Sequence, residues 1–377
     1  MARNIDDRLR ALNTRRKGTD RIAKLAADSA AEVLQKSTIQ EAWQKRAVSQ
    51  PFTRYALGAM QAVTARYTEI GIETALRVGK QLAEGLTRSV IFRLQGSVPL
   101  DVHIRGVSDV DLLTLDTAFL TYASYGPKGQ SGAYWPTAST SLGVLTALRK
   151  EAETLLKEKY PKATVDCSGG KCISLSGGSL ARPVDVVPAH WNDTYDYQVS
   201  GQEHDRGVTI LDKKVPETVD NLPFLHIKRV HDRDITCLGG MKKAIRLIKN
   251  VKNDAENESS AAKLPSFDIA GLMYHADQTA FIIGYNYELS ILREAQRFMD
   301  WCYHNKDAAM KLRTPDSSRC ILNTTDKFEG LTTISVELYK LAQDVAKEQS
   351  FVLRSMEHPD WSSVERALRN THIPEAA

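Results

Sequence analysis

A pair of aspartates at the start of an apolar run limits the folds open to this chain more than any other feature. Asp109 and Asp111 are two residues apart and lead into Leu112-Leu113, so in a β-strand both carboxylates point to one face of the sheet. Carboxylates held that close repel each other unless a cation lies between them. Mg²⁺ suits this position, because it binds carboxylate oxygens and substrate phosphates together. The pair therefore predicts a strand that begins at a metal site.

Two further features stand in a fixed order around this pair. Gly96 and Ser97 lie upstream and predict a turn at a helix–strand junction, where glycine lets the backbone approach a triphosphate and serine donates hydrogen bonds to its oxygens. Downstream, Asp185 lies in the apolar run 183–189, where an unpaired charge would be costly. A strand next to that of Asp109 would make Asp185 a third ligand of the same metal ions.

The hydropathy pattern predicts an α+β fold. Residues 1 to about 90 read as helical, with apolar side chains at a mostly helical spacing over 68–94, and helices return from about residue 236. Between these parts, β-type runs predict a small mixed sheet, with a hairpin at Gly169-Gly170. The predicted strands are 102–104, 110–115, 163–167, 172–175 and 183–187, with a helix at 141–160. The predicted domains are an N-terminal helical extension (1–60), a core of sheet and flanking helices (61–235) and a C-terminal helical domain (236–377).

The predicted C-terminal helices carry apolar and cationic side chains in parallel stripes. A buried stripe at helical spacing is expected from Met241, Ile245 and Ile248. One residue on, the same spacing produces a cationic stripe of Lys242, Arg246 and Lys249. This second stripe is either a solvated face or part of a ligand site. Residues 251–262 have the composition of a solvated linker. Further helices are predicted at 267–276, 287–303 and 332–348, with capping boxes at 37–40 and 362–365.

Composition narrows the class of protein. With 50 basic against 46 acidic side chains, the net charge of +4 is too balanced to identify a nucleic-acid binder. The five cysteines are an odd number and thinly spread, so we expect free thiols; Cys167 and Cys172, with no second pair nearby, are a weak zinc candidate. The sequence contains no apolar stretch of about 18 residues and no secretory signal. We therefore expect a cytoplasmic protein.

The ordered set of motifs resembles the polymerase-β-like nucleotidyltransferase core shared by oligoadenylate synthetases, cyclic GMP–AMP synthase and the bacterial cGAS/DncV-like nucleotidyltransferases (CD-NTases). Residues 108–112 (Ser-Asp-Val-Asp-Leu) and 184–189 (Val-Asp-Val-Val-Pro-Ala) are close to that family's two signatures. Residues 241–249 resemble its lid helix, and residues 264–267 (Leu-Pro-Ser-Phe) resemble the start of the following helix. In all, the resemblance covers about residues 90–290. It implies the same core, followed by a C-terminal helical lid domain.

The resemblance also implies a two-metal nucleotidyl transfer. Asp109, Asp111 and Asp185 would bind two Mg²⁺ ions, with Mn²⁺ as an alternative, and Asp185 would also be the general base. The substrates would be nucleoside triphosphates, ATP among them. The product would be a cyclic di- or trinucleotide second messenger that activates a downstream effector in bacterial antiphage (CBASS) signalling. A regulatory, ubiquitin-ligase-like partner is a further implied contact, at the C-terminal tail Glu375-Ala376-Ala377.

The nucleotide-binding residues implied by the resemblance are Gln95, Gly96, Ser97, Lys242, Ser266 and Phe267. Lys242 would hold the donor triphosphate, and Ser266 would bind phosphate. Phe267 would stack on the donor base, at a position where the family usually has tyrosine; a plain core position is the other interpretation of this residue. Val98-Pro99-Leu100 departs from the glycine-containing turn that usually follows the serine.

Three other activities of the same fold remain open at this point. A linear polymerase or RNA-tailing enzyme differs only in its acceptor. A catalytically silent nucleotide or RNA sensor would not need all three aspartates. A small-molecule nucleotidyltransferase would lack a lid of the kind expected from Lys242 and Ser266-Phe267.

Overall fold

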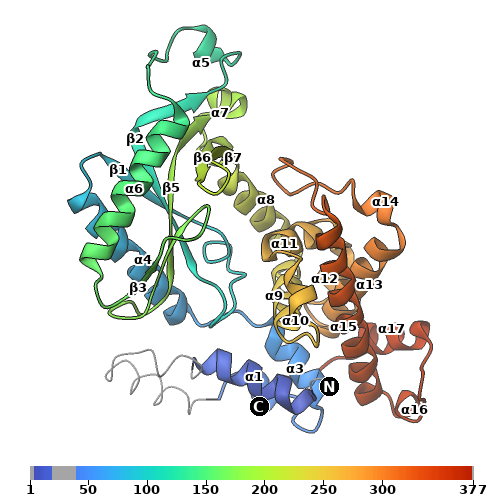
Figure 1. Cartoon of the computed structure of the whole chain (residues 1–377). Coiled ribbons are helices and arrows are strands. Elements are labelled where there is room, and N and C mark those ends of the chain that lie inside the picture. The colour runs from blue at the N-terminus through green and yellow to red at the C-terminus, as the bar shows by residue number, and fades with distance from the viewer. Residues whose placement is uncertain (1–3, 19–39, 376–377) are drawn as a thin grey trace.

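A mixed β-sheet forms the centre of one lobe of the molecule, and an all-helical lobe lies beside it (Figure 1). The structure is a computed structural model, and it describes residues 4–18 and 40–375. The main path of the sheet has the order β1-β2-β5-β4-β3, while β6 pairs with the far half of β5 and β7 pairs with β6. Within the described residues the strands are β1 (Val90–Gln95), β2 (Val110–Tyr122), β3 (Thr164–Asp166), β4 (Ile173–Ser176), β5 (Val184–Asp193), β6 (Gly207–Asp212) and β7 (Glu217–Asn221).

The two faces of this sheet have different neighbours. The helices of the sheet lobe are α4 (Ala65–Gly85), α5 (Pro127–Gln130), α6 (Ser141–Lys159), α7 (Tyr195–Ser200) and the short η3 (Glu203–Asp205). On one face, α4 and α6 bury Leu112 and Val186 in a continuous apolar cluster. Side chains alternate between the faces of a strand, so Asp111 and Asp185 point to the opposite face. Further along that face, Leu115 and Ala189 belong to a second apolar cluster, to which α8 contributes.

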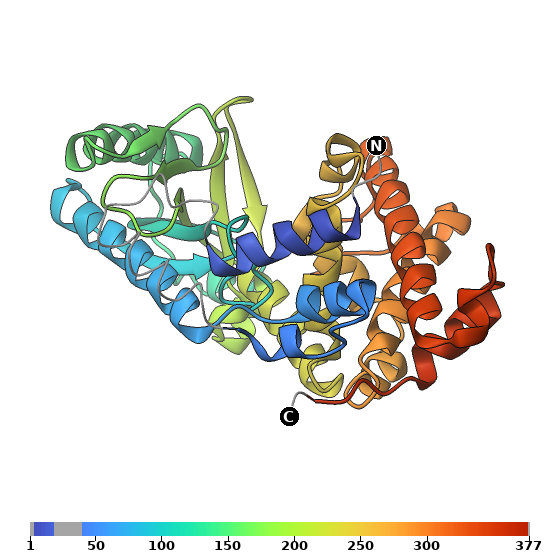
Figure 2. The same cartoon turned by 90° about the horizontal axis from the view of Figure 1, so that it is seen from below.

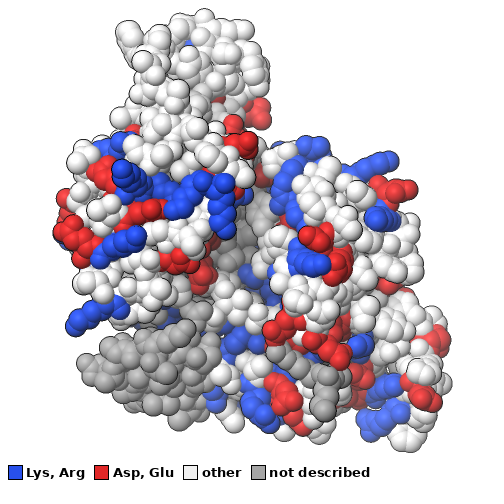
Figure 3. Space-filling view, viewed as in Figure 1, with Lys and Arg blue, Asp and Glu red and all other residues white. Residues whose placement is uncertain are grey.

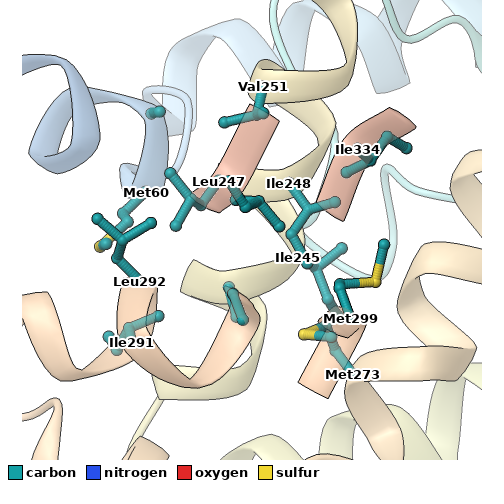
Figure 4. Packing of buried hydrophobic residues seen from close by; sticks show 14 of the residues in the cluster. Met60, Ile245, Leu247, Ile248, Val251, Met273, Ile291, Leu292, Met299 and Ile334 are labelled. Carbon is teal, nitrogen blue, oxygen red and sulfur yellow. The ribbon is translucent and has the colours of Figure 1, made fainter. Parts of the chain in front are cut away.

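Helix α9 lies at the centre of the helical lobe, packed against α3, α11, α13 and α15. Figure 4 shows Ile245 and Ile248 of this helix beside Met299 and Ile334. Met241, Ile245 and Ile248 have no exposed surface, so the predicted apolar stripe is confirmed. The helices of this lobe are α8 (Pro223–Thr236), α9 (Gly240–Asn253), α10 (Glu258–Ala262), α11 (Ser266–Tyr274), α12 (Gln278–Ile283), α13 (Leu289–His304), α14 (Lys306–Ala309), α15 (Thr325–Gln349), α16 (Phe351–Arg354) and α17 (Trp361–Asn370).

The N-terminal helices share the core of the helical lobe. They are α1 (Ile5–Lys17), the short η2 (Ala42–Lys45) and α3 (Pro51–Met60). Arg15 donates two hydrogen bonds of 2.6 Å to the fully buried carboxylate of Asp254, and the Tyr55 hydroxyl donates a third at 2.8 Å. Figure 2 shows α1 running from the boundary between the lobes toward the helical lobe, with α3 beside it. This network therefore fixes α1 and α3 to the end of α9.

The predicted α+β class is confirmed, and the elements that differ have physical causes. The helix expected over 68–94 ends at Gly85, because the Val-Ile-Phe run that follows pairs with β2 as strand β1. Residues 102–104 form no strand, since side chains of α9 bind this loop in place of a neighbouring strand. Residues 251–262 are not a linker: α9 continues to Asn253, and the Asn257 side chain caps α10.

Other differences lie at element ends. α8 begins at Pro223, well before the predicted start of the helical half, and β6 and β7 were not predicted. The last helix is capped by Asp360, whose side chain accepts a hydrogen bond from the Ser363 N–H, and not by Ser362 as expected. The hairpin at Gly169-Gly170 joins β3 to β4 as predicted. The capping box at 37–40 falls, except for its last residue, outside the described residues. No helix in the described part of the chain could span a membrane.

Replacing Asp254 by alanine should destabilise the protein strongly, because it removes the carboxylate that neutralises the buried Arg15 guanidinium. Removing one partner of a buried ion pair costs about 3–5 kcal/mol. Tyr55→Phe removes one neutral donor from the same carboxylate and should cost about 1 kcal/mol. Chemical denaturation of both variants and the unmodified protein measures these losses. A loss below about 1 kcal/mol for Asp254→Ala would show that the network does not hold α1 in place.

Candidate active site

Asp111 and Asp185 lie side by side in the sheet. Strands β2 and β5 are parallel, and their register pairs Asp111 with Asp185. Because paired residues of neighbouring strands direct their side chains to the same face, both carboxylates lie on the face opposite α4 and α6. Asp109 lies just before β2, two residues from Asp111. The structure therefore brings the predicted aspartates together at the start of β2 and β5.

The charges in this group favour a bound cation. Burial, together with the charges of Asp185 and Asp109, raises the pKa of Asp111 to about 7, while the charge of Lys249 acts in the opposite direction. A divalent cation between the carboxylates would offset both the loss of hydration and the mutual repulsion. The group has the electrostatic character of a metal site.

Gly96 lies directly against the carboxylate of Asp111. It follows Gln95, the last residue of β1, which is paired with Asp111 across the antiparallel β1–β2 ladder. The φ of Gly96 is 77°, in the left-handed region that favours glycine. A Cβ atom at this position would lie 2.2 Å from Asp111 Oδ2. The predicted Gly96-Ser97 turn is present, but it ends a strand and does not open a helix–strand junction as expected.

The loop after this turn joins the two lobes. Val98 is buried in the apolar cluster of the sheet lobe, whereas Leu100 and Val102 are buried in that of the helical lobe. The Val102 N–H donates to the Ser97 carbonyl at 3.0 Å, which closes the loop on itself. The unusual Val98-Pro99-Leu100 sequence is thus explained by packing, because its two apolar side chains anchor the loop in both cores.

The cationic stripe of α9 is buried, so the solvated-face interpretation is wrong, and two of its three members bind this loop. Arg246 donates to the carbonyls of Asp101 and Met60, at 2.7 and 2.8 Å. Lys249 Nζ donates to the Val102 carbonyl at 2.7 Å and lies 3.4 Å from Ser108 Oγ, one residue before Asp109. Burial lowers the pKa of Lys249 to about 7.

Lys242 contacts a different element. Its Nζ lies 3.1 Å from His231 Nδ1 and 3.9 Å from Asp234 Oδ2, both on α8, and its backbone N–H donates to Asp234 Oδ1. These contacts join α9 to α8 and do not reach Asp109, Asp111 or Asp185. Lys249 lies in the same stripe but was not predicted as a site residue. It is the member of the stripe whose charge acts on Asp111. Its spacing of seven from Lys242 was the available signal.

Ser266 and Phe267 begin α11, as expected for the start of the helix. Phe267 is 39% exposed, so it is not a plain core residue. One face of its ring stacks on the His226 ring of α8, with centroids 4.1 Å apart, and the Arg319 guanidinium lies 5.4 Å from its centroid. Ser266 is half-buried beside it. An aromatic surface of this kind is able to stack on a base.

Known proteins share both the fold and the sequence. Residues 228–334 match the C-terminal helical domain of the cGAS/DncV-like nucleotidyltransferases. The cyclic dinucleotide synthase CdnE of Yersinia aleksiciae is 41% identical over 360 residues, which cover 93% of this chain and 92% of that protein. The chain belongs to the cGAS/DncV-like nucleotidyltransferases.

Solved structures of CD-NTases agree with this assignment at the level of the fold. The STING-associated CdnE c-di-GMP synthase from Flavobacteriaceae sp. has a TM-score of 0.71 at 21% identity, over 92% of this chain and 99% of that chain. The corresponding enzyme of Capnocytophaga granulosa has a TM-score of 0.67 at 23% identity, over 90% and 97% of the two chains. The predicted family and the polymerase-β-like core with a helical domain are therefore confirmed, and the protein is a nucleotidyltransferase.

The residues of this CD-NTase fit a metal that is shared with its substrate. Within residues 4–18 and 40–375, no three His, Cys, Asp or Glu side chains form a group placed to hold a metal ion. Mg²⁺ does not need one, because it keeps several waters and is commonly bound by one or two carboxylates together with substrate phosphates. The adjacent Asp111 and Asp185 supply such carboxylates.

Gly96→Ala should abolish most of the nucleotidyl transfer by this CD-NTase, because the new methyl group displaces the Asp111 carboxylate. For a group that takes part in the reaction, a misplacement of about 1 Å costs about 100-fold in rate. Gly177→Ala is the matched control, since Gly177 has a similar φ of 76° but no atom within 4 Å of the added Cβ. Pyrophosphate release from nucleoside triphosphates measures both. Equal losses in the two variants would attribute the effect to backbone strain and not to Asp111.

Proposed function

We propose that the chain makes a cyclic di- or trinucleotide from nucleoside triphosphates, ATP among them, by two-metal catalysis. The observation that carries this proposal is the parallel register of Asp111 and Asp185, with Asp109 two residues before Asp111. The name of the Yersinia relative, cyclic dinucleotide synthase, supports a cyclic product. We expect the reaction to take place in the cytoplasm, where nucleoside triphosphates are available.

In this mechanism the three aspartates would hold two Mg²⁺ ions, or Mn²⁺, which lower the cost of negative charge on the phosphates. Asp185 accepts the proton of the attacking hydroxyl at its carboxylate. The hydroxyl oxygen forms a bond to the α-phosphorus in line, and the bond between that phosphorus and pyrophosphate breaks. For a cyclic dinucleotide, a second transfer within the linear intermediate closes the ring and releases a second pyrophosphate; a cyclic trinucleotide needs one more transfer before closure. The same side chains serve every step, because the same type of bond is formed.

The triphosphate would lie against the turn after β1. Gln95 ends that strand opposite Asp111, and Gly96 and Ser97 form the turn that follows, where glycine leaves the backbone accessible to the phosphates. Figure 3 shows a recess between the two lobes, with Lys and Arg side chains on both of its sides, which suits an anionic substrate. Ser266 would bind phosphate, and Phe267 would stack on the donor base.

A downstream effector in antiphage signalling would bind the product, as the family resemblance implies. The implied regulatory partner would have to bind a C-terminal tail whose preceding residues are held by hydrogen bonds to Arg46. Arg46 donates to the carbonyls of Ile373 and Pro374, at 2.7 and 2.9 Å. Of the predicted tail, Glu375 follows these residues, and Ala376 and Ala377 lie outside the described residues.

Incubation with the four labelled triphosphates, singly and mixed, tests the function. A cyclic product resists phosphatase because it has no terminal phosphate, whereas a linear oligonucleotide loses the label of its 5′-terminal phosphates. A tailing enzyme is recognised instead by its need for an RNA acceptor. Asp109→Ala with Asp111→Ala should abolish pyrophosphate release and leave the fold intact, since the change removes repelling charges. Chelation of divalent metal should also stop the reaction. Unchanged turnover in the double variant would exclude the proposed site, and a phosphatase-sensitive product would favour the linear alternative.

The role of the lid lysines is decided by their kinetics. Lys242→Ala should raise the triphosphate KM more than it lowers kcat, if its contact is with the ground-state phosphates. Lys249→Ala should lower kcat as well, because it removes the cation beside Ser108 and the carboxylates. Lys243→Ala is the control on the same helix, since the side-chain contact that it loses among the described residues is with Glu288. An unchanged KM for Lys242→Ala with a raised KM for Lys249→Ala would move the triphosphate contact to Lys249.

A further inference from the structure

Strand β4 presents a hydroxyl to the third aspartate. β4 and β5 are antiparallel, and their register pairs Ser174 with Asp185. Both side chains therefore lie on the same face, and Ser174 Oγ donates a hydrogen bond of 2.6 Å to Asp185 Oδ1. Asp185 thus has Asp111 on one neighbouring strand and Ser174 on the other.

The hydroxyl is itself held in place. Cys172 Sγ lies 3.6 Å from Ser174 Oγ. The Cys172 carbonyl accepts a hydrogen bond of 2.9 Å from the Arg149 guanidinium, which also binds the carbonyls of Gly169 and Gly170 at 2.7 Å. Arg149 belongs to α6 and is only 2% exposed. The hairpin that leads into β4 is therefore fixed to the helix behind the sheet.

The neutral character of this partner distinguishes Asp185 from several buried aspartates elsewhere in the described structure. Those are neutralised by a cation, in the pairs Asp116–Arg88, Asp193–Arg206, Asp254–Arg15 and Asp268–Arg319. A guanidinium beside Asp185 would compete with a metal ion for its charge. A hydroxyl, in contrast, orients the carboxylate and leaves its negative charge in place, because it donates a hydrogen bond and is itself uncharged.

We propose that Ser174 is a positioning residue that holds Asp185 Oδ1 so that the second oxygen, Oδ2, remains for the metal ion and for the proton of the attacking hydroxyl. This inference rests on the proposed function, because it assigns Ser174 a role through a carboxylate that acts in that reaction. Partners that orient metal ligands contribute substantially to metal affinity, and their loss costs about 10- to 100-fold in affinity or activity.

Three substitutions test the role of Ser174. Ser174→Ala should raise the Mg²⁺ concentration for half-maximal rate about tenfold or more and lower kcat. At saturating Mg²⁺ the triphosphate KM should stay near that of the unmodified chain, because Ser174 has no place in the triphosphate contacts. Ser174→Thr keeps the hydroxyl and suits a strand, so it should restore both values. Ser176→Ala removes an exposed serine two residues along β4 and should change neither.

A metal titration without turnover makes the test independent of activity. Mn²⁺ binding in the presence of a non-hydrolysable ATP analogue should weaken in Ser174→Ala but not in Ser176→Ala. In an Asp185→Asn background, Ser174→Ala should have no further effect, because the carboxylate through which it acts is gone. Thermal unfolding of each variant establishes that the fold is intact. If Ser174→Ala is unfolded, the comparison of Mn²⁺ affinity between Ser174→Thr and Asp185→Asn decides the test.

The outcomes separate this inference from the function on which it rests. Half-saturating Mg²⁺, kcat and Mn²⁺ affinity of Ser174→Ala equal to those of Ser176→Ala would overturn the positioning role and leave the proposed function standing. A failure of Ser174→Thr to bind Mn²⁺ better than Asp185→Asn would overturn it as well. An unmodified chain that binds Mn²⁺ yet releases no pyrophosphate from any triphosphate would instead overturn the proposed function.

Discussion

The parallel pairing of β2 with β5 is the constraint on which the rest of the structure depends. It holds the carboxylates of Asp111 and Asp185 at adjacent positions although their charges repel. The packing of the other face makes this arrangement possible, because Leu112 and Val186 are buried between the sheet and its two covering helices. A shift of one residue in register would turn the aspartates into that apolar cluster. The same packing that stabilises the sheet therefore sets the position of the charges.

The second constraint is the loop of residues 96–109, which belongs to both lobes. Its apolar side chains Val98 and Leu100 are buried in different cores, and its carbonyls accept hydrogen bonds from Arg246 and Lys249. Charged donors form stronger hydrogen bonds than neutral ones, so the helical lobe is bound firmly to the segment that leads to the first aspartate. A displacement of α9 would consequently be transmitted to Asp109 and Asp111.

Features that depend on neighbouring residues could be predicted from the sequence, whereas features that depend on contacts between distant segments could not. The adjacency of Asp111 and Asp185 could be predicted because the spacing and apolar flanks that indicated it are local, and the register of β2 and β5 pairs the two residues. The family resemblance selected Lys242, but the stripe itself contains no signal that separates Lys242 from Lys249, because only the docking of α9 onto the loop distinguishes their contacts. Residues 251–262 looked like a linker, since their polar composition conceals a helix that packs on α15.

The contact between Arg15 and Asp254 spans 239 residues of sequence, and this has a consequence for the order in which the protein matures on the ribosome. All strands that the structure describes lie between these two residues, so the sheet lobe is complete in the nascent chain before the helical lobe can close. Until then, α1 and α3 expose apolar side chains that have no partner from α9. Exposed apolar surface of this kind attracts chaperones and promotes aggregation. The N-terminal helices are thus made long before the helix that buries them.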